Sequence, residues 1–236
     1  VALAVWHLLL PLYVAVLIAL LIAVLVSLYL AEPTRNHSES SGANGAVCNL
    51  GYFDPRYRLF LLVGVVICLG MSVSTQMMGF YLPYVLHMEV SRAAAPLGMV
   101  QALMAGATVF GQLVLVQRLS WRPIRLLQAG LPVMACGFAF LAGATGMVQL
   151  GIGVFLLGLG LGISGPGFSA AVSLSVNSDE QGAIAGMLAA CPALGYVIGP
   201  FGAGWLYEWQ ARAPFVLVML LLLAVWPVLL RHRLQD

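Results

Sequence analysis

The sequence predicts an all-α fold, a polytopic membrane helical bundle with seven transmembrane helices. The chain is 62% hydrophobic and only 8% charged, whereas charged residues make up about 25% of soluble domains. Its eighteen charged residues fall into six short clusters, and the apolar stretches between them are 31, 30, 25, 53, 27 and 18 residues long. Because a helix crosses a hydrocarbon core about 30 Å thick with about 20 apolar residues, each stretch spans the membrane once and the longest spans it twice.

The expected elements follow in chain order, each bounded by charged or turn-forming residues. The predicted spans are residues 6–30, 60–86, 95–117, 126–144, 150–174, 183–206 and 213–230. The first stretch is too long for the apolar part of a signal peptide and lacks a basic leader, so a span is expected there. The next connection, 32–58, is rich in Pro, Ser, Gly and Asn, which is typical of a flexible linker.

This pattern predicts a single span, a cytoplasmic linker and a compact six-helix transmembrane bundle. The predicted domains are residues 1–31, 32–58 and 59–236. Since the chain begins with Val, we expect it to be the C-terminal piece of a longer polypeptide.

The arginines predict the orientation. All ten basic residues are arginine, and alternating connections place eight of them on one side of the membrane, with Arg92 and Arg212 on the other. The eight are Arg35, Arg56, Arg58, Arg118, Arg122, Arg125, Arg231 and Arg233. Basic residues near span ends favour the cytoplasmic side, so a cytoplasmic C-terminus is expected. The net charge of +2 is too small to indicate a nucleic-acid partner.

Neither a metal site nor a disulfide is expected. Cys48 lies in the predicted cytoplasmic connection and the other three cysteines lie inside spans, unlike an extracellular disulfide framework. The pair Asp179 and Glu180 is interpreted as a solvated helix-start signal rather than a metal site.

Small residues recur in the fifth and sixth predicted spans at four-residue or near four-residue steps, which lets helix backbones approach closely in lipid. The candidate packing or hinge residues are Gly162, Pro166, Gly195, Gly199 and Pro200. Two interpretations remain open. These residues either serve packing alone, or they let the helices bend and slide during a transport cycle.

The segment from Gly158 to Glu208 resembles the C-terminal half of major facilitator superfamily transporters, in particular the drug and tetracycline efflux type. The resemblance lies in the run Gly165-Pro166-Gly167-Phe168-Ser169, in the turn Asn177-Ser178-Asp179-Glu180-Gln181-Gly182, and in Leu194-Gly195-Tyr196-Val197-Ile198-Gly199-Pro200. The loop Gln117-Arg118-Leu119-Ser120-Trp121-Arg122-Pro123 resembles the family's cytoplasmic Asp-Arg-x-Gly-Arg motif. Arg118 and Arg122 match that motif, but Gln117 and Ser120 replace its Asp and Gly.

The resemblance implies that the seven spans are numbers six to twelve of a twelve-span transporter. The expected partners are a small-molecule substrate, the lipid bilayer and the missing N-terminal half of the same polypeptide. The resemblance further implies a gradient-driven exporter that needs no cofactor. Such a transporter would be monomeric when full length and would lie in a bacterial inner membrane.

Uncharged polar side chains are the best candidates for handling a substrate, because no charged residue lies deep in a span. In the third span, Gln101, Thr108 and Gln112 fall within about 40° on one helix face. The second span carries Ser72 and Gln76 on a similar stripe. Since the family builds its central cavity partly from these two spans, we expect the stripes to face each other across it. The remaining candidates, adaptable apolar surface, are Phe80, Tyr84 and Met104.

Interhelical hydrogen bonding is the structural alternative for every one of these polar residues. Other functions fit the sequence less well. A seven-span receptor has the same topology, but the long linker fits it poorly, and a retinal protein or a Walker loop needs a lysine that the chain lacks. The run Gly162-Ile163-Ser164-Gly165 matches the Gly-x-Ser-Gly of rhomboid proteases, yet the next histidine, His232, lies beyond the last span. No enzymatic activity is therefore expected.

Overall fold

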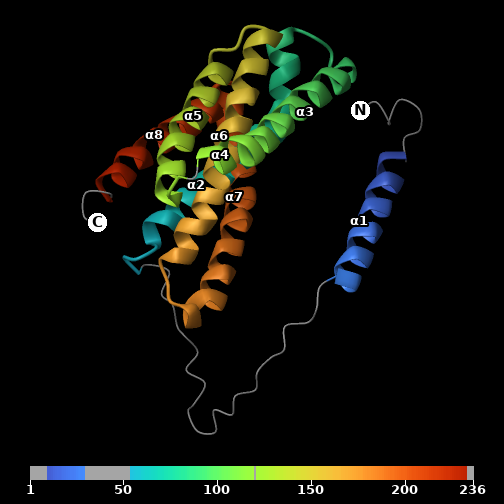
Figure 1. Ribbon diagram of the computed structural model, residues 1–236. Coiled ribbons are helices and arrows are strands. Elements are labelled where there is room, and N and C mark those ends of the chain that lie inside the picture. Colours follow the sequence, from blue (N-terminus) through green and yellow to red (C-terminus); the bar gives the residue numbers. More distant parts are fainter. Residues whose placement is uncertain (1–9, 30–53, 120, 233–236) are drawn as a thin grey trace. The chain divides into compact units, whose positions relative to one another are not determined.

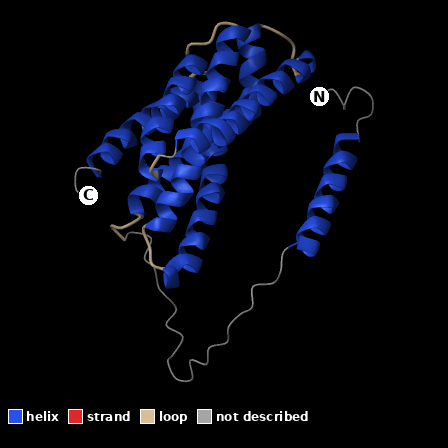
Figure 2. Cartoon of the chain, in the orientation of Figure 1, coloured by secondary structure: helices blue, strands red, loops and turns tan. Residues whose placement is uncertain are grey.

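The computed structural model describes residues 10–29, 54–119 and 121–232, which form helices joined by short turns (Figures 1 and 2). Within these ranges no residue belongs to a β-strand. The chain divides into two compact units, Val1–Asn49 and Leu50–Asp236. The all-α prediction is therefore confirmed. The predicted linker, 32–58, falls mostly outside the described residues and stays a prediction.

The first unit contains helix α1, Leu10–Tyr29, within the first predicted span. The helix carries no charged residue, and between residues 13 and 28 nearly all of its large apolar side chains are exposed, from 45% at Leu25 to 73% at Leu28. A water-soluble helix would bury such a surface, whereas a lipid-facing helix has no need to.

The second unit contains six helices that are long and apolar enough to cross a membrane, counted over the described residues. They are α2 Arg58–Leu86, α3 Ala94–Phe110 with its π-helical continuation η2 Gly111–Val116, α5 Pro123–Ala142, α6 Met147–Leu174, α7 Gln181–Trp209 and α8 Ala213–His232. Short helical turns lie between them: η1 Val90–Arg92, α4 Gln117–Leu119 and η3 Ser178–Glu180. The limits differ from the predicted spans by only a few residues.

Local sequence signals set several helix ends. Pro123 begins α5, where its fixed φ suits a helix and its missing N–H costs no bond. Asn177 and Glu180 form a reciprocal capping box ahead of α7, which confirms the helix-start interpretation of Glu180. At the end of α2, His87 adopts a left-handed conformation with φ of 50°, and its N–H donates to the Pro83 carbonyl.

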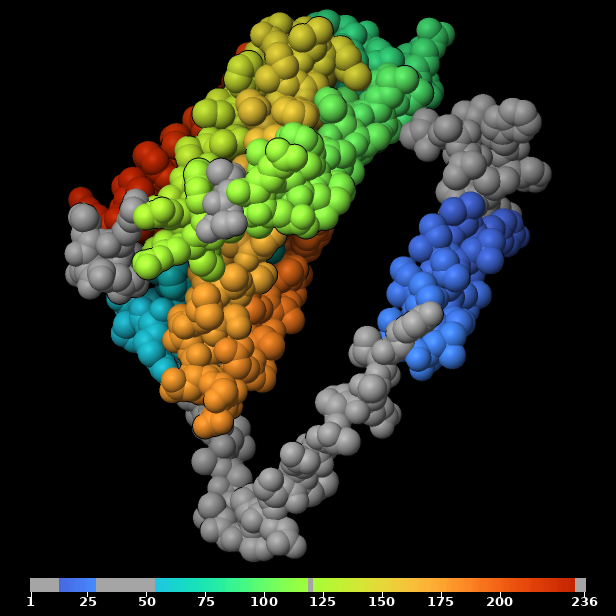
Figure 3. Space-filling view, in the orientation of Figure 1, coloured from blue at the N-terminus to red at the C-terminus, as the bar shows by residue number. Residues whose placement is uncertain are grey.

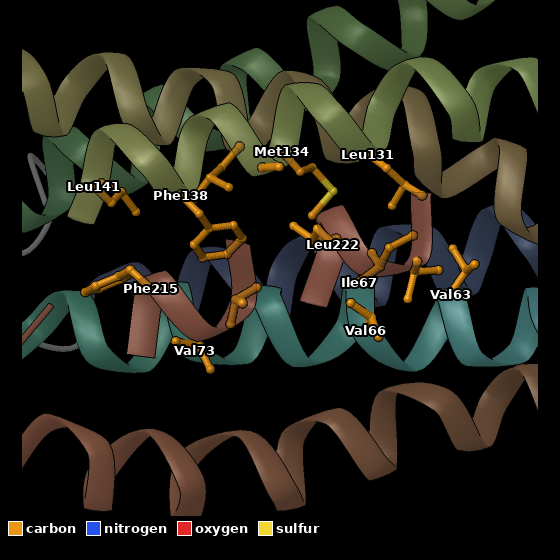
Figure 4. Close-up of a cluster of buried hydrophobic side chains, with 14 of the residues drawn as sticks. Val63, Val66, Ile67, Val73, Leu131, Met134, Phe138, Leu141, Phe215 and Leu222 are labelled. Carbon is orange, nitrogen blue, oxygen red and sulfur yellow. The ribbon is translucent and has the colours of Figure 1, made fainter. Parts of the chain in front are cut away.

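The core of the second unit lies where α2, α5 and α8 meet. Figure 4 shows side chains from the three helices converging there, among them Ile67, Phe138 and Phe215. Phe138 and Phe215 are fully buried, and their ring centroids lie 6.5 Å apart. Tyr81 joins this core and donates its hydroxyl to the Leu141 carbonyl at 2.6 Å. Helix α5 packs between α6 and α8, α2 packs against α7 and α8, and α3 packs chiefly against α6.

Turns from distant parts of the chain gather at two opposite ends of this unit. At one end, a hollow is lined by Arg56 before α2, Arg122 before α5 and Ser175 after α6. Gln128 Nε2 donates to the Leu229 carbonyl at 3.3 Å, which brings the last turn of α8 to the same end. At the other end, Arg212 donates to the Ala144 carbonyl at 3.4 Å. We call the first of these the arginine-rich end. The turns that share each end are the ones predicted to lie on the same side of the membrane.

Candidate functional site

The predicted stripe on α2 has an exposed part and a buried part. Gln76, Phe80 and Tyr84 follow one another at four-residue steps and are all exposed, Phe80 to 62% and Tyr84 to 53%. Ser72 is fully buried, and its hydroxyl accepts a hydrogen bond of 3.2 Å from Gln76 Nε2. Gln76 therefore has one amide hydrogen and its carbonyl oxygen left to bind another group.

Helix α7 frames this face of α2. The Tyr207 hydroxyl donates to the Phe80 carbonyl at 3.2 Å, and the two rings lie 6.4 Å apart. On the same helix turn, Tyr84 stacks on buried Tyr81 at 6.1 Å. The exposed face therefore combines a glutamine with aromatic rings that neighbouring side chains hold in place.

The predicted stripe on α3 is less open. Gln101 and Thr108 are half-buried and Gln112 is exposed. The Thr108 hydroxyl donates to the Met104 carbonyl at 2.9 Å, so this hydroxyl already has a partner within the helix. Met104 is buried, with 7% exposure. Its predicted role as adaptable apolar surface of a substrate pathway stays a prediction.

The two stripes lie on helices whose main neighbours differ. Helix α2 packs chiefly against α7, whereas α3 packs chiefly against α6 (Figure 1). The two helices also have a smaller contact with each other, and α6 contacts both of them. Among the described residues no hydrogen bond joins Gln76 or Ser72 to Gln101 or Gln112. A cavity common to both stripes stays a prediction.

Two of the candidate glycines lie where α7 contacts α2, Gly195 against backbone and Gly199 against the Ser72 side chain. A Cβ built on Gly195 would lie 2.7 Å from the Cys68 backbone carbon, and one on Gly199 would lie 2.9 Å from the Ser72 hydroxyl oxygen. Pro200 follows within α7, and the helix continues through it. Replacing Gly195 would push α7 away from the helix that carries Gln76, whereas replacing Gly199 would crowd the Ser72 side chain.

The third candidate glycine lies in the contact between α6 and α3. A Cβ on Gly162 would overlap the Thr108 carbonyl oxygen, and one on Gly158 would overlap the Met104 carbonyl oxygen. Pro166, one turn beyond Gly162, is half-buried within α6 and does not interrupt the helix. Close packing is therefore present at these positions, and a hinge role stays a proposal.

Directly opposite Gly162, helix α3 changes from α- to π-helical winding at Gly111. A Cβ on Gly111 would lie 3.1 Å from the Leu159 carbonyl oxygen, so both helices need glycine where they meet. Gln112, the last residue of the predicted stripe, lies within this π segment. Such segments often occur at functional sites and disturb the regular hydrogen-bond ladder. Sequence reasoning missed it, because no residue pattern specifies π winding.

An ion-pair network at the arginine-rich end was also missed. Arg56 bonds bidentately to Glu180, with both N–O distances 3.1 Å, and it pairs with Asp54 at 2.9 Å. These hydrogen bonds lower the pKa of Asp54 and raise that of Arg56. The alternation of connections was the signal that could have found the pair, since it placed Arg56 and Glu180 on the same side.

The two arginines of the loop motif are both exposed. Arg122 precedes α5, and its carbonyl accepts the N–H groups of Arg125 and Leu126. Neither Arg118 nor Arg122 forms an ion pair with a described residue. The motif's Ser120 lies outside the described residues.

The serine of the rhomboid-like run has a structural environment. Ser164 is fully buried, its hydroxyl donates to the Gly160 carbonyl at 2.7 Å, and it lies 3.5 Å from the Met134 sulfur. Elsewhere in the described residues, no group of three His, Cys, Asp or Glu side chains is placed to hold a metal ion.

The family model described as Major Facilitator Superfamily matches residues 1–192. No similar sequence was found among curated proteins. The match includes α1 and most of the second unit, and so covers both candidate stripes.

Proposed function

Because the chain belongs to the major facilitator superfamily, a family of membrane transporters, we propose that it moves a small molecule across the membrane by alternating access. In this mechanism one helical bundle rocks against another around a site near the middle of the membrane. The six membrane-capable helices of the second unit would form one of these bundles. The residues 1–31 would belong to the other, with 32–58 as the linker.

The observation that carries the proposal is the exposed face of α2 formed by Gln76, Phe80 and Tyr84. A glutamine amide turned toward lipid would lose its hydrogen bonds to water, so this face is expected to line a cavity or contact protein. Aromatic rings beside a few polar groups are typical of small-molecule sites. Gln76 would orient the substrate, and the rings would contact its apolar parts.

Gln101 and Gln112 would provide the second wall of the same pathway. They lie on α3, whose contacts with α6 depend on Gly158 and Gly162. If α3 shifts along α6 during transport, these close contacts permit the movement because no side chain stands between the backbones. Gly162, Gly195 and Gly199 would then serve as both packing and sliding positions.

The proposal also includes the class of substrate, the direction of transport and the orientation of the protein in the membrane. The chain carries no charged residue deep in a predicted span, which favours a neutral or lipophilic substrate over an ionic one. The resemblance to drug and tetracycline transporters favours export driven by an ion gradient. The excess of arginine at one end favours a cytoplasmic arginine-rich end and C-terminus, in the inner membrane of a bacterium. We propose a monomer as the working unit.

Alanine substitution of Gln76 and of Gln101 tests the proposed pathway. We expect each variant to change the order of preference in a panel of neutral lipophilic compounds. The loss of one hydrogen bond to a substrate costs about 1 kcal/mol of binding free energy, which would weaken the apparent affinity about five-fold. The measurement is the accumulation of each compound in cells that express the full-length polypeptide.

Gln210→Ala is the matched control, because Gln210 is an exposed glutamine at the turn after α7, outside both stripes. An unchanged compound profile in Gln76→Ala and Gln101→Ala at normal expression would contradict the proposal. Loss of expression without any change of profile would show that these side chains serve packing instead.

A further inference from the structure

Four arginines surround the start of α5 at the arginine-rich end, and we call them the arginine collar. They are Arg118, Arg122, Arg125 and Arg231. The first three lie in or beside the turn between α4 and α5. Arg231 is brought there by α8, because Gln128 donates to the Leu229 carbonyl at 3.3 Å and Trp226 Nε1 donates to the Gln128 carbonyl at 2.9 Å. All four side chains are exposed.

The collar carries positive charge that no described acidic side chain neutralises. Across the described ranges, the ion pairs are those of Arg56 with Asp54 and Glu180. These two carboxylates are therefore already engaged by an arginine outside the collar. The remaining described acid at this end, Asp179, is exposed and forms no ion pair. The collar is thus an anion-attracting surface.

Two hollows flank the collar. One, of about 490 Å³, is lined by Trp121, Arg125 and Gln128. The other, of about 610 Å³, has Arg122 together with apolar walls that include Ile124 and Leu174. Figure 3 shows the yellow-green atoms of the α4–α5 corner at the surface of the visible face. Both hollows therefore place a guanidinium beside apolar or aromatic surface.

The expected position of the collar relative to the membrane favours a lipid phosphate as the anion. The collar lies at the ends of α5 and α8, both of which are membrane-capable helices. If these helices span the bilayer, their ends place the arginines at the level of the lipid phosphates. Trp121, 41% exposed, has the amphipathic ring that is enriched at that level. Basic pockets between transmembrane helices bind the head groups of anionic lipids. A guanidinium also matches the geometry of a phosphate through paired N–H donors.

We infer that the arginine collar binds the phosphate groups of anionic phospholipids at the membrane surface. The apolar walls of the hollows would contact the upper part of the acyl chains, while Arg122 and Arg125 bind the head group. The opposite end lacks this surface, since Arg92 and Arg212 are accompanied by Glu89 and Glu208. The inference needs only the membrane placement of the helices, and it does not depend on transport or on which leaflet the collar faces.

The test measures binding of a fluorescently labelled phosphatidylglycerol to the detergent-solubilised full chain, by fluorescence anisotropy. The double variant Arg122→Gln/Arg125→Gln is expected to bind the probe about 25-fold more weakly. Each arginine near an anionic lipid surface contributes about five-fold to the affinity, and the two effects multiply. Arg122→Lys/Arg125→Lys keeps both charges and is expected to retain most of the affinity. Arg92→Gln, at the opposite end, is the matched control and should bind as the unaltered chain does.

Competition distinguishes a lipid from a free anion. Unlabelled phosphatidylglycerol should displace the probe, whereas inorganic phosphate and phosphatidylcholine should not. Displacement by inorganic phosphate at equal concentration would overturn the lipid assignment. Unchanged affinity in the Arg→Gln pair, or equal loss in Arg92→Gln, would overturn the collar itself. Each variant is compared at matched monodispersity and thermal midpoint, so that misfolding is not mistaken for lost binding.

Discussion

Arg56 links two carboxylates that lie far apart in the sequence. Asp54 precedes α2, and Glu180 lies in the turn between α6 and α7, where it also caps the backbone N–H of Asn177 at 3.1 Å. A bidentate guanidinium–carboxylate pair is more directional than a lysine pair, so it fixes the start of α2 against this turn. The charges of Asp179 and Glu180 were interpreted from the sequence only as a helix-start signal. The partner could not be identified because a capping position does not specify what else the carboxylate binds.

Arg56→Gln is expected to lower the thermal midpoint of the protein slightly, because exposed ion pairs are weak. The effect should depend on pH. Arg56 holds the pKa of Asp54 below its ordinary value, so the contribution of this pair is present above the unfolded pKa of about 4. It is lost as the pH falls through the lower pKa of the folded state.

The measurement is the thermal midpoint of the unaltered chain and of Arg56→Gln at neutral and at acidic pH. The difference between the two proteins should shrink on acidification. A difference that grows or stays constant as the pH falls would show that the pair is not what Arg56 contributes.

The helices themselves follow from the apolar stretches, but their contacts do not. A run of about 20 apolar residues must form a helix in lipid, which is why the spans were predicted within a few residues. Small residues at four-residue steps predicted close packing without naming the partner helix. The structure assigns Gly162 to α3 and Gly195 to α2. The π winding at Gly111 depends on this tertiary contact, so no local pattern could reveal it.

Substitution of two glycines on the same helix tests the packing of α6 on α3. Gly162→Ala is expected to destabilise the protein by about 1–3 kcal/mol, because the added methyl group overlaps the Thr108 carbonyl and forces the backbones apart. Gly165→Ala is the control. It lies less than one turn away with nothing within 4 Å of its added Cβ, and alanine favours a helix by up to about 1 kcal/mol over glycine.

Unfolding in detergent, followed by circular dichroism, measures both variants. We expect Gly162→Ala to unfold at lower denaturant concentration than the unaltered chain, and Gly165→Ala to unfold at an equal or higher one. Equal unfolding of the two variants would mean that the contact at Gly162 does not limit stability.

In the whole molecule, the positions of the eighteen charged residues predicted both the spans and the connections that share an end. Their spacing predicted the spans, and their alternation predicted the common end that now includes Arg56, Arg122 and Arg231. Which helices are neighbours could not be predicted, because apolar faces in lipid carry no partner information. The candidate site was predicted in part. Gln76, Phe80 and Tyr84 do share an exposed face, whereas the buried position of Met104 depends on how α3 packs against α6.

On the proposed mechanism, the polar faces of α2 and α3 line a water-filled substrate pathway. Its most direct test is the reaction of Gln76→Cys and Gln112→Cys with a membrane-impermeant maleimide, in a full-length chain whose native cysteines are replaced by serine. Leu220→Cys is the control, since Leu220 is an exposed apolar residue on α8. We expect rapid labelling at positions 76 and 112, slowed by substrate, with little labelling at position 220. Labelling at position 76 as slow as at position 220 would show that this face meets lipid or protein, and would contradict the proposed pathway.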